Sequence, residues 1–396
     1  MTATPGAMTG AAALPWRVVS VSVLTVSVGL LPGFLPGVLA VRMADDVDIA
    51  IVGVGIVVGV FFSVSALASP VMGRVAENVS WARSMRLSMS GAALTLAFTA
   101  LLADSVLTLA LISVIGGVAL ALGQPATNLA LARCTLMGRQ GLAYGFRHAA
   151  VPAALALSGI ALPAVALPLG WRWVYVITAA LAVLTVLLIP LHPTRYELSE
   201  APTDGPATSG RLTTPMSLLV LLAVAAALGM IGTAFVTFLV LYSVDVGFSE
   251  ASAGILLAVG SLLGMSMRLV AGWQIDRRAA GGLPTVAGFL VLGAVGLVVV
   301  GIGVPPLVVV GSLVAFAFGL GWAGLFTFAV VRANPLAPAA STAITQTGRF
   351  VGAAVGPPLF GLLAEGISFE VAWGSMALAL AVAGGLMRYV SGRISG

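Results

Sequence analysis

Residues 192–215, HPTRYELSEAPTDGPATSGRLTTP, form the only long polar stretch in a chain that otherwise consists of apolar runs. The stretch is rich in Pro, Thr, Ser, Gly and charged residues, which is typical of a flexible linker. Six apolar runs precede it and six follow it. This division predicts two six-helix halves that are joined by a linker.

The composition indicates a chain that lies almost entirely in a lipid bilayer. Of the 396 residues, 60% are hydrophobic and 8% are charged, and the mean hydropathy is +1.14. A soluble domain carries about 25% charged residues, and a membrane-spanning helix needs about 20 apolar residues. The apolar runs lie at 16–41, 50–72, 84–103, 106–130, 141–168, 172–190, 215–242, 250–271, 283–303, 305–330, 341–364 and 370–389. We therefore predict an all-α membrane protein with twelve transmembrane helices in two pseudo-symmetric six-helix bundles.

The expected organisation has five parts. These are a cytosolic N-terminal tail at 1–15, an N-terminal six-helix bundle at 16–190, a cytosolic linker at 191–214, a C-terminal six-helix bundle at 215–389 and a cytosolic C-terminal tail at 390–396. The first apolar run is too long for the apolar segment of a signal peptide, so we expect it to be the first membrane helix.

Charged residues between the runs predict the orientation of the chain. Arginines follow the even-numbered runs, whereas the other loops are acidic or neutral, with Arg42 and Arg172 as the two exceptions. The arginines of the even-numbered loops are Arg74, Arg83, Arg86, Arg133, Arg139, Arg195, Arg211, Arg277, Arg278 and Arg332. By the positive-inside rule, both termini lie in the cytoplasm of a cell whose plasma membrane the chain spans, which we expect to be a bacterial inner membrane.

The two halves also match each other at two nearly equal offsets. Five pairs are 199 residues apart: Gly33/Gly232, Asp46/Asp245, Gly73/Gly272, Glu77/Asp276 and Arg133/Arg332. Three more are 202 residues apart: Arg147/Arg349, Gly159/Gly361 and Trp171/Trp373. Registers that persist over so many predicted helices indicate parallel six-helix repeats.

Three arginines fall inside predicted spans, namely Arg147, Arg268 and Arg349. An arginine in the middle of a membrane helix costs about 2.5–3.5 kcal/mol on insertion scales, so such residues are candidates for function. At 1.5 Å per residue, all three lie about 10–12 Å inside the cytosolic boundary. Because Arg147 and Arg349 are related by the repeat, we expect them to face each other across a central cavity.

No acidic residue lies in the middle of a predicted span, since all 13 fall in loops or at helix ends. Buried cations without a partner favour binding of an anion, and a carboxylate or another small oxyanion can accept two hydrogen bonds from one guanidinium group. For Arg147 an alternative is that its head group reaches the cytosol or bonds to helix-end carbonyl groups.

Other polar residues of the spans are candidates for lining the substrate pathway. They are Gln124, Asn128, Tyr144, Thr233, Thr237 and Gln346. Each of them could instead form hydrogen bonds between helices. His148 titrates near neutral pH and is the candidate for proton coupling, with a purely structural role as the alternative.

The segment Gly272–Arg278, GWQIDRR, resembles the loop signature of the major facilitator superfamily. A partial copy, GRVAE, runs from Gly73 to Glu77. The resemblance covers the whole chain and implies the twelve-helix fold and secondary active transport. An acid at a helix end can hold a neighbouring helix and so latch one conformation. The candidate latch comprises Gly73, Glu77, Gly272, Asp276 and Arg277, with a solvated loop charge as the alternative for Asp276.

The spacing Arg268-x3-Gly272-x3-Asp276, together with Arg349, is similar to the monocarboxylate and oxalate/formate branches of that superfamily. In those branches, basic residues on the eighth and eleventh helices hold the substrate carboxylate. The resemblance implies this role for Arg268 and Arg349. The chain departs from the monocarboxylate pattern because the first helix has no Lys and no acid accompanies Arg268.

We therefore expect a secondary active transporter that moves a small anion, most simply an organic carboxylate, by alternating access. The expected partners are an anionic small molecule, a co-transported proton and the lipid bilayer, with no nucleic acid, and the expected state is a monomer. No cofactor and no enzyme activity are expected, because no catalytic triad, paired carboxylates or metal cluster occurs in the spans. Two alternatives stay open: a major facilitator exporter of neutral drugs or sugars, and a non-transporting membrane receptor or scaffold.

Overall fold

The computed structural model describes residues 15–135, 137–191, 212–278, 282–334 and 336–395, and every regular element in these ranges is a helix. The first six spans are α1 (Trp16–Val47), α2 (Ile51–Val79), α3 (Trp81–Leu102), α4 (Val106–Cys134), the series α5 (Met137–Ala161), η1 (Leu162–Ala166) and α6 (Leu167–Leu169), and α7 (Trp171–Leu188). The last six are α8 (Met216–Ile231) with α9 (Ala234–Asp245), α10 (Glu250–Arg278), α11 (Leu283–Gly301), α12 (Pro305–Val314) with η3 (Ala315–Gly319) and α13 (Trp322–Ala333), α14 (Pro338–Gly366) and α15 (Phe369–Ser395).

Eleven helical segments of the described chain are long and apolar enough to cross a membrane. The twelfth span is α14, whose 29 residues extend about 43 Å at 1.5 Å per residue. Its first half is polar and includes Thr345, Gln346 and Arg349. The predicted all-α architecture of twelve spans is thus confirmed, and the span with the weakest hydropathy signal carries one of the candidate arginines.

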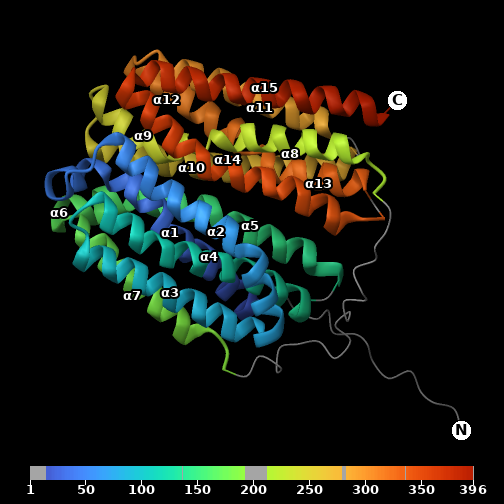
Figure 1. Cartoon of the computed structure of the whole chain (residues 1–396), viewed down its shortest axis with the longest axis horizontal. Coiled ribbons are helices and arrows are strands. Elements are labelled where there is room, and N and C mark those ends of the chain that lie inside the picture. The colour runs from blue at the N-terminus through green and yellow to red at the C-terminus, as the bar shows by residue number, and fades with distance from the viewer. Residues whose placement is uncertain (1–14, 136, 192–211, 279–281, 335, 396) are drawn as a thin grey trace, which may run out of the picture.

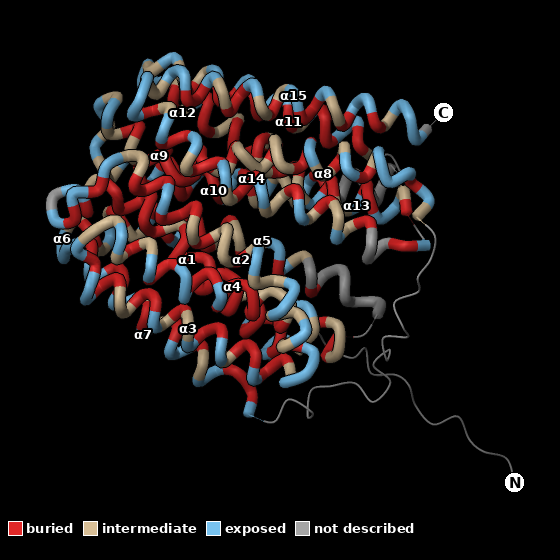
Figure 2. Tube along the Cα trace, viewed as in Figure 1, coloured by how far each residue is buried: buried red, intermediate tan, exposed pale blue. Residues whose placement is uncertain are grey.

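The two halves lie side by side as separate bundles (Figure 1), the first coloured blue to green and the second yellow to red. We define the linker end as the end of the molecule where α7 ends and α8 begins. The acidic end is the opposite one, where Asp46, Glu250 and Glu365 lie. Figure 2 shows buried segments inside each bundle and between the bundles, with exposed positions along the outer faces that would contact lipid.

Three of the predicted runs are interrupted helices. The fifth span passes through the π-helix η1, which contains Pro163. The seventh is broken at Gly232–Thr233, and the tenth passes from the π-helix η3 into a break at Leu320–Gly321. Proline lacks the backbone donor, and glycine stabilises a helix poorly. Side chains take up freed groups, as where the Thr233 hydroxyl donates to the Met230 carbonyl at 2.7 Å. Hydropathy predicts the spans but not these breaks.

The packing of side chains reflects the repeat. In the N-terminal half, the Tyr175 hydroxyl lies 3.8 Å from the Met43 sulfur. The two registers place Ala377 at the position of Tyr175 and Tyr242 at the position of Met43. The tyrosine is therefore on α7 in the N-terminal half, but in the C-terminal half it is on α9, in the span equivalent to α1. The contact still joins the first and last spans of each half.

At the acidic end the two halves are in close contact. Arg42 Nε of α1 donates to Glu250 Oε2 of α10 at 2.6 Å, and the Val52 amide of α2 donates to Glu365 Oε2 of α14 at 2.9 Å. A Cβ atom at Gly159 of α5 would lie 2.6 Å from the carbonyl oxygen of Gly254 in α10. Only glycine permits this approach of the two backbones, so the acidic end is closed in this structure.

Candidate functional site

The three predicted arginines lie at similar depths, one on each of α5, α10 and α14. Arg147 and Arg268 are ten residues, and Arg349 is eleven residues, from the linker-end terminus of their helices. At 1.5 Å per residue this depth is about 15–17 Å. It exceeds the predicted depth because the helices extend beyond the apolar runs at the linker end.

Arg147 is buried, with 7% of its surface exposed, and its guanidinium group bonds to α4. Nε donates to the Thr127 hydroxyl at 3.0 Å, and Nη2 donates to the Gln124 carbonyl at 3.2 Å and to the Gln124 side-chain oxygen. Arg147 thus has neutral acceptors among the described residues, and its bond to the Gln124 carbonyl favours the alternative of carbonyl binding for this residue. Its neutral acceptors come from a neighbouring helix, which a sequence pattern along one helix does not reveal. Arg147 cross-links α5 to α4.

Arg268 contacts the break in the tenth span. Its Nη2 donates to the Leu320 carbonyl oxygen at 2.7 Å, and its Nε is buried without a hydrogen-bond partner among the described residues. The contact joins α10 to the junction between η3 and α13. The guanidinium group thus keeps unused donors while one of its nitrogens fixes its position.

The side chain of Arg349 forms a hydrogen bond within its own helix, α14. Its Nη1 donates to the Gln346 side-chain oxygen at 2.9 Å, and its Nε is also buried with no partner in the described part of the chain. Arg268 on α10 and Arg349 on α14 therefore lie at similar depths of the C-terminal half, each with an Nε that has no described partner. Cations without a described carboxylate partner favour binding of an anion.

His148 follows Arg147 in the N-terminal half. Its imidazole is exposed, and its helix α5 packs against α10 of the C-terminal half. His148 thus lies on a helix that borders the other half. Because the acidic end is closed and His148 is exposed, we infer that the space between the halves opens toward the linker end.

The described carboxylates lie away from these arginines, in loops or close to helix ends. They are Asp46, Asp48, Glu77, Asp104, Asp245, Glu250, Glu365 and Glu370. The two arginines that depart from the charge pattern are paired at the acidic end, Arg42 with Glu250 and Arg172 with Asp46. Among described residues, no three His, Cys, Asp or Glu side chains are arranged to hold a metal ion.

The other predicted pathway residues are in several environments. Gln124 holds Arg147, and Gln346 holds Arg349. Asn128 is exposed one turn beyond Gln124. Thr233 bonds to Met230 at the helix break.

Thr237 is 5% exposed and packs against Gly37 of α1, so it belongs to the contact between the halves in this conformation. The side chain of Tyr144 lies outside the described residues. The structure therefore groups Gln124 and Gln346 with the arginines and separates Thr237 from them.

The candidate latch is described only in its N-terminal copy. Gly73 and Glu77 lie in the last turns of α2, and Glu77 is exposed. Gly272, Asp276 and Arg277 lie on α10, but their side chains are outside the described residues. The latch stays a prediction.

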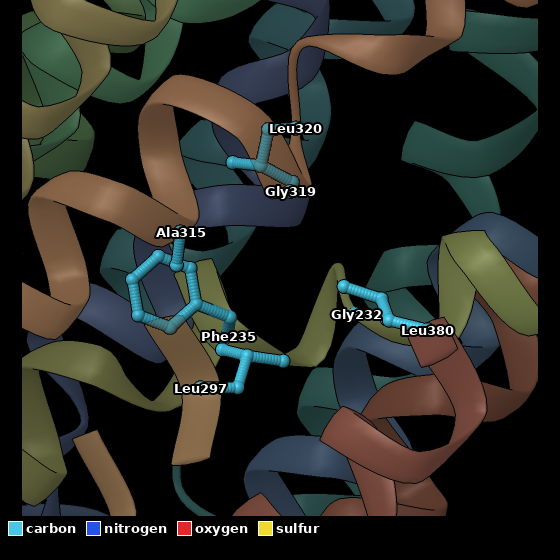
Figure 3. Close-up of a pocket in the computed structure, with 7 residues that line it drawn as sticks. All are labelled: Gly232, Phe235, Leu297, Ala315, Gly319, Leu320 and Leu380. Atoms are coloured by element: carbon cyan, nitrogen blue, oxygen red, sulfur yellow. The ribbon is translucent and has the colours of Figure 1, made fainter. Parts of the chain in front are cut away.

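A small cavity in the C-terminal half (Figure 3) is lined in part by Leu320, whose carbonyl oxygen accepts the hydrogen bond from Arg268. It is lined by Gly232, Phe235, Leu297, Ala315, Gly319, Leu320 and Leu380. The lining side chains are apolar, so the cavity is unsuited to a charged substrate. It is notable instead because it adjoins the breaks in the seventh and tenth spans.

Twelve spans in two repeated halves, with arginines inside both halves, form the architecture of a membrane transporter. The Major Facilitator Superfamily matches residues 20–357, and the chain belongs to that family. No match was found among curated proteins.

Solved structures share this fold at low sequence identity. A bacterial homolog of the human lysosomal transporter Spinster, inward-facing and occupied, has a TM-score of 0.76 and 14% identity, covering 96% of this chain and 98% of that chain. A D-xylose–proton symporter has a TM-score of 0.73 and 13% identity, covering 95% and 97%. A peptide transporter in complex with alafosfalin has a TM-score of 0.73 and 14% identity, covering 95% and 94%.

Proposed function

We propose that this transporter carries a small anion, most simply an organic carboxylate, and that Arg268 and Arg349 bind it. The observation that supports the proposal is the pair of buried Nε atoms without described hydrogen-bond partners, on two arginines that lie at similar depths of the C-terminal half. A buried donor that lacks a partner is unfavourable, and a carboxylate supplies both the acceptor and the compensating charge. Binding would therefore compensate the charge of the guanidinium groups.

The geometry of Arg349 suits a carboxylate. Gln346 occupies Nη1, so Nε and the second terminal nitrogen are left for the ligand. These two nitrogens form one edge of the planar guanidinium group and can donate in parallel to two carboxylate oxygens. Arg268 is held at one nitrogen by Leu320 and contributes the second charge.

The orientation and the coupling belong to the same proposal. The arginine-rich loops favour a cytoplasmic linker end, and with that orientation the site would be exposed to the cytosol. His148, which follows Arg147 on α5, is the candidate carrier of a coupled proton. The neighbours named above include a sugar–proton symporter and a peptide transporter, so side chains rather than fold must decide the cargo.

The test is transport by reconstituted protein with a panel of carboxylates, nitrate, cyanate, sugars and drugs. Arg349→Ala and Arg268→Lys should each lower anion uptake by about 10–100-fold, the effect of losing hydrogen bonds to a charged group. Arg388→Ala removes an exposed arginine near the linker end and serves as the matched control. Thermal melting of each variant establishes that it is folded.

Two outcomes would contradict the proposal. One is parental anion transport by folded Arg268→Lys and Arg349→Ala variants. The other is thermal stabilisation of the parent by neutral sugars or drugs alone, which would favour a neutral exporter. The sign of the membrane current during uptake would additionally separate uniport of the anion from proton symport.

A further inference from the structure

Trp373 of α15 carries a buried donor that has no acceptor. Its side chain is fully buried, and Nε1 lacks a hydrogen-bond partner among the described residues. The indole ring packs against Tyr242 of α9 at a centroid distance of 5.4 Å and against Phe360 of α14 at 4.4 Å. Buried N–H groups without partners are uncommon in native proteins, so this one requires an explanation.

In the N-terminal half, the tryptophan at the equivalent position has a hydrogen-bond acceptor. Trp171, which the repeat relates to Trp373, donates from Nε1 to Asp46 Oδ2 at 2.9 Å. The repeat relates Asp46 to Asp245. Asp46 lies in the last turn of α1, which runs as one helix from Trp16 to Val47. A continuous helix therefore delivers the carboxylate to the indole.

In the C-terminal half, the helix that carries Asp245 is broken. Gly232 and Thr233 separate α8 from α9, and α9 packs against α1, where a Cβ at Gly37 would lie 2.9 Å from Thr237 Cα. Asp245 is exposed and lies three residues beyond Tyr242, so the two side chains occupy one face of α9. The carboxylate is consequently about one turn from the ring that already contacts Trp373.

The cavity in Figure 3 lies beside this break. Gly232 and Phe235 line it from the seventh span, and Ala315 and Gly319 line it from the interrupted tenth span. Packing beside the break is locally incomplete, whereas close-packed helices resist a change of angle. The break is thus suited to act as a hinge for α9.

We propose that Asp245 and Trp373 form a hydrogen bond when the acidic end is open, and that the bond is released when α9 bends toward α1 to close it. Closure gains the contact between Gly37 and Thr237 and loses the acceptor of Trp373. Opening restores in the C-terminal half the arrangement that Asp46 and Trp171 keep in the N-terminal half. The pair sets the balance between the two conformations, whatever the transported substrate is.

The experiment measures how often the acidic end opens. Thr237→Cys in a Cys134→Ser background places a thiol in the contact between the halves, and its rate of modification by a methanethiosulfonate reagent reports the open population. Trp373→Phe keeps the ring and removes the donor, while Asp245→Asn weakens the acceptor. Each should slow modification by about tenfold, the effect of one hydrogen bond to a charged group, and the double variant should be no slower than the Trp373→Phe variant.

Matched controls come from the N-terminal pair. Trp171→Phe and Asp46→Asn remove a bond that both conformations keep, so they should lower the melting temperature without changing the modification rate. Asp245 is exposed, so Asp245→Asn tests the proposal even if Trp373→Phe fails to fold. An unchanged modification rate in Asp245→Asn, or fully additive effects in the double variant, would overturn the proposal.

Discussion

Arg147 and Arg349 occupy equivalent positions in the two halves, yet their surroundings differ. Arg147 bonds to Gln124 and Thr127 of the neighbouring helix. The repeat places Ala323 and Phe326 at those positions in the C-terminal half, and neither side chain accepts a hydrogen bond. Arg349 therefore relies on Gln346 and keeps an unpaired Nε. The same residue at the same repeat position is a structural cross-link in one half and a candidate binding group in the other, because of its neighbours.

The largest effect should come from removing each arginine in turn. Arg349→Gln should lower uptake of the anion by about 100-fold while leaving the melting temperature close to that of the parent. Arg147→Gln should instead destabilise the protein by about 1.5–3 kcal/mol, because it breaks charged hydrogen bonds between α4 and α5. Proteoliposome uptake and thermal melting separate the two. Equal transport losses in both variants would remove the distinction between the halves.

A second effect, of intermediate size, should come from giving Arg349 the acceptor that Arg147 has. Ala323→Gln places an amide at the position equivalent to Gln124, where it can compete with the substrate for the guanidinium group. A neutral hydrogen bond contributes about 1 kcal/mol, so the KM for the anion should rise about fivefold. Ala323→Leu has similar bulk without the acceptor and is the control. A rise of the same size with leucine would indicate steric obstruction rather than competition.

The smallest effect concerns Asp46 and its counterpart Asp245. The pKa of Asp46 is lowered from its ordinary value of 3.8, chiefly by the Trp171 hydrogen bond and then by Arg172. A carboxyl group with a lowered pKa in the folded state stabilises the protein above its ordinary pKa, and the contribution is lost as the pH falls through the lowered value. Asp46→Asn should therefore reduce stability at pH 7, and the difference from the parent should shrink below about pH 3.8.

Because Asp46 is largely exposed, this difference should be well below 1 kcal/mol. Melting temperatures of the parent and the variant across that pH range would measure it. Asp245→Asn, whose carboxylate has no indole partner in this structure, should not show the same loss at pH 7. A loss of equal size in both variants would mean that the indole contact contributes nothing.

The sequence predicted the spans because a bilayer imposes one requirement on every crossing helix, and apolar length reports it directly. It also predicted that Arg147, Arg268 and Arg349 share one depth, since depth follows from position along a helix, but it underestimated that depth because the helices extend beyond the apolar runs. It did not predict the acceptors of Arg147, which lie 20 and 23 residues earlier on another helix. Which way a side chain points around its helix depends on tertiary packing, which hydropathy does not describe.

The two arginines that depart from the charge pattern mark ion pairs at the acidic end. Arg42 and Arg172 departed from the positive-inside rule, and the structure pairs each with a carboxylate at the same end. The neighbouring acids were visible in the sequence and could have suggested such pairs. The choice of partner could not be deduced, because Arg42 pairs across the halves with Glu250 and Arg172 pairs within its own half.

The contact between Glu365 and the backbone of α2 closes the acidic end in a way that tolerates mutation at Val52 but not at Glu365. The donor is the main-chain amide of Val52 in the first turn of α2, where the helix dipole also favours a negative charge. Any residue except proline supplies that amide, so α2 can change its side chain there without losing the bond. At position 365 the side chain itself is the acceptor, so its replacement removes the bond. Substitutions should therefore be more frequent among relatives at position 52 than at position 365.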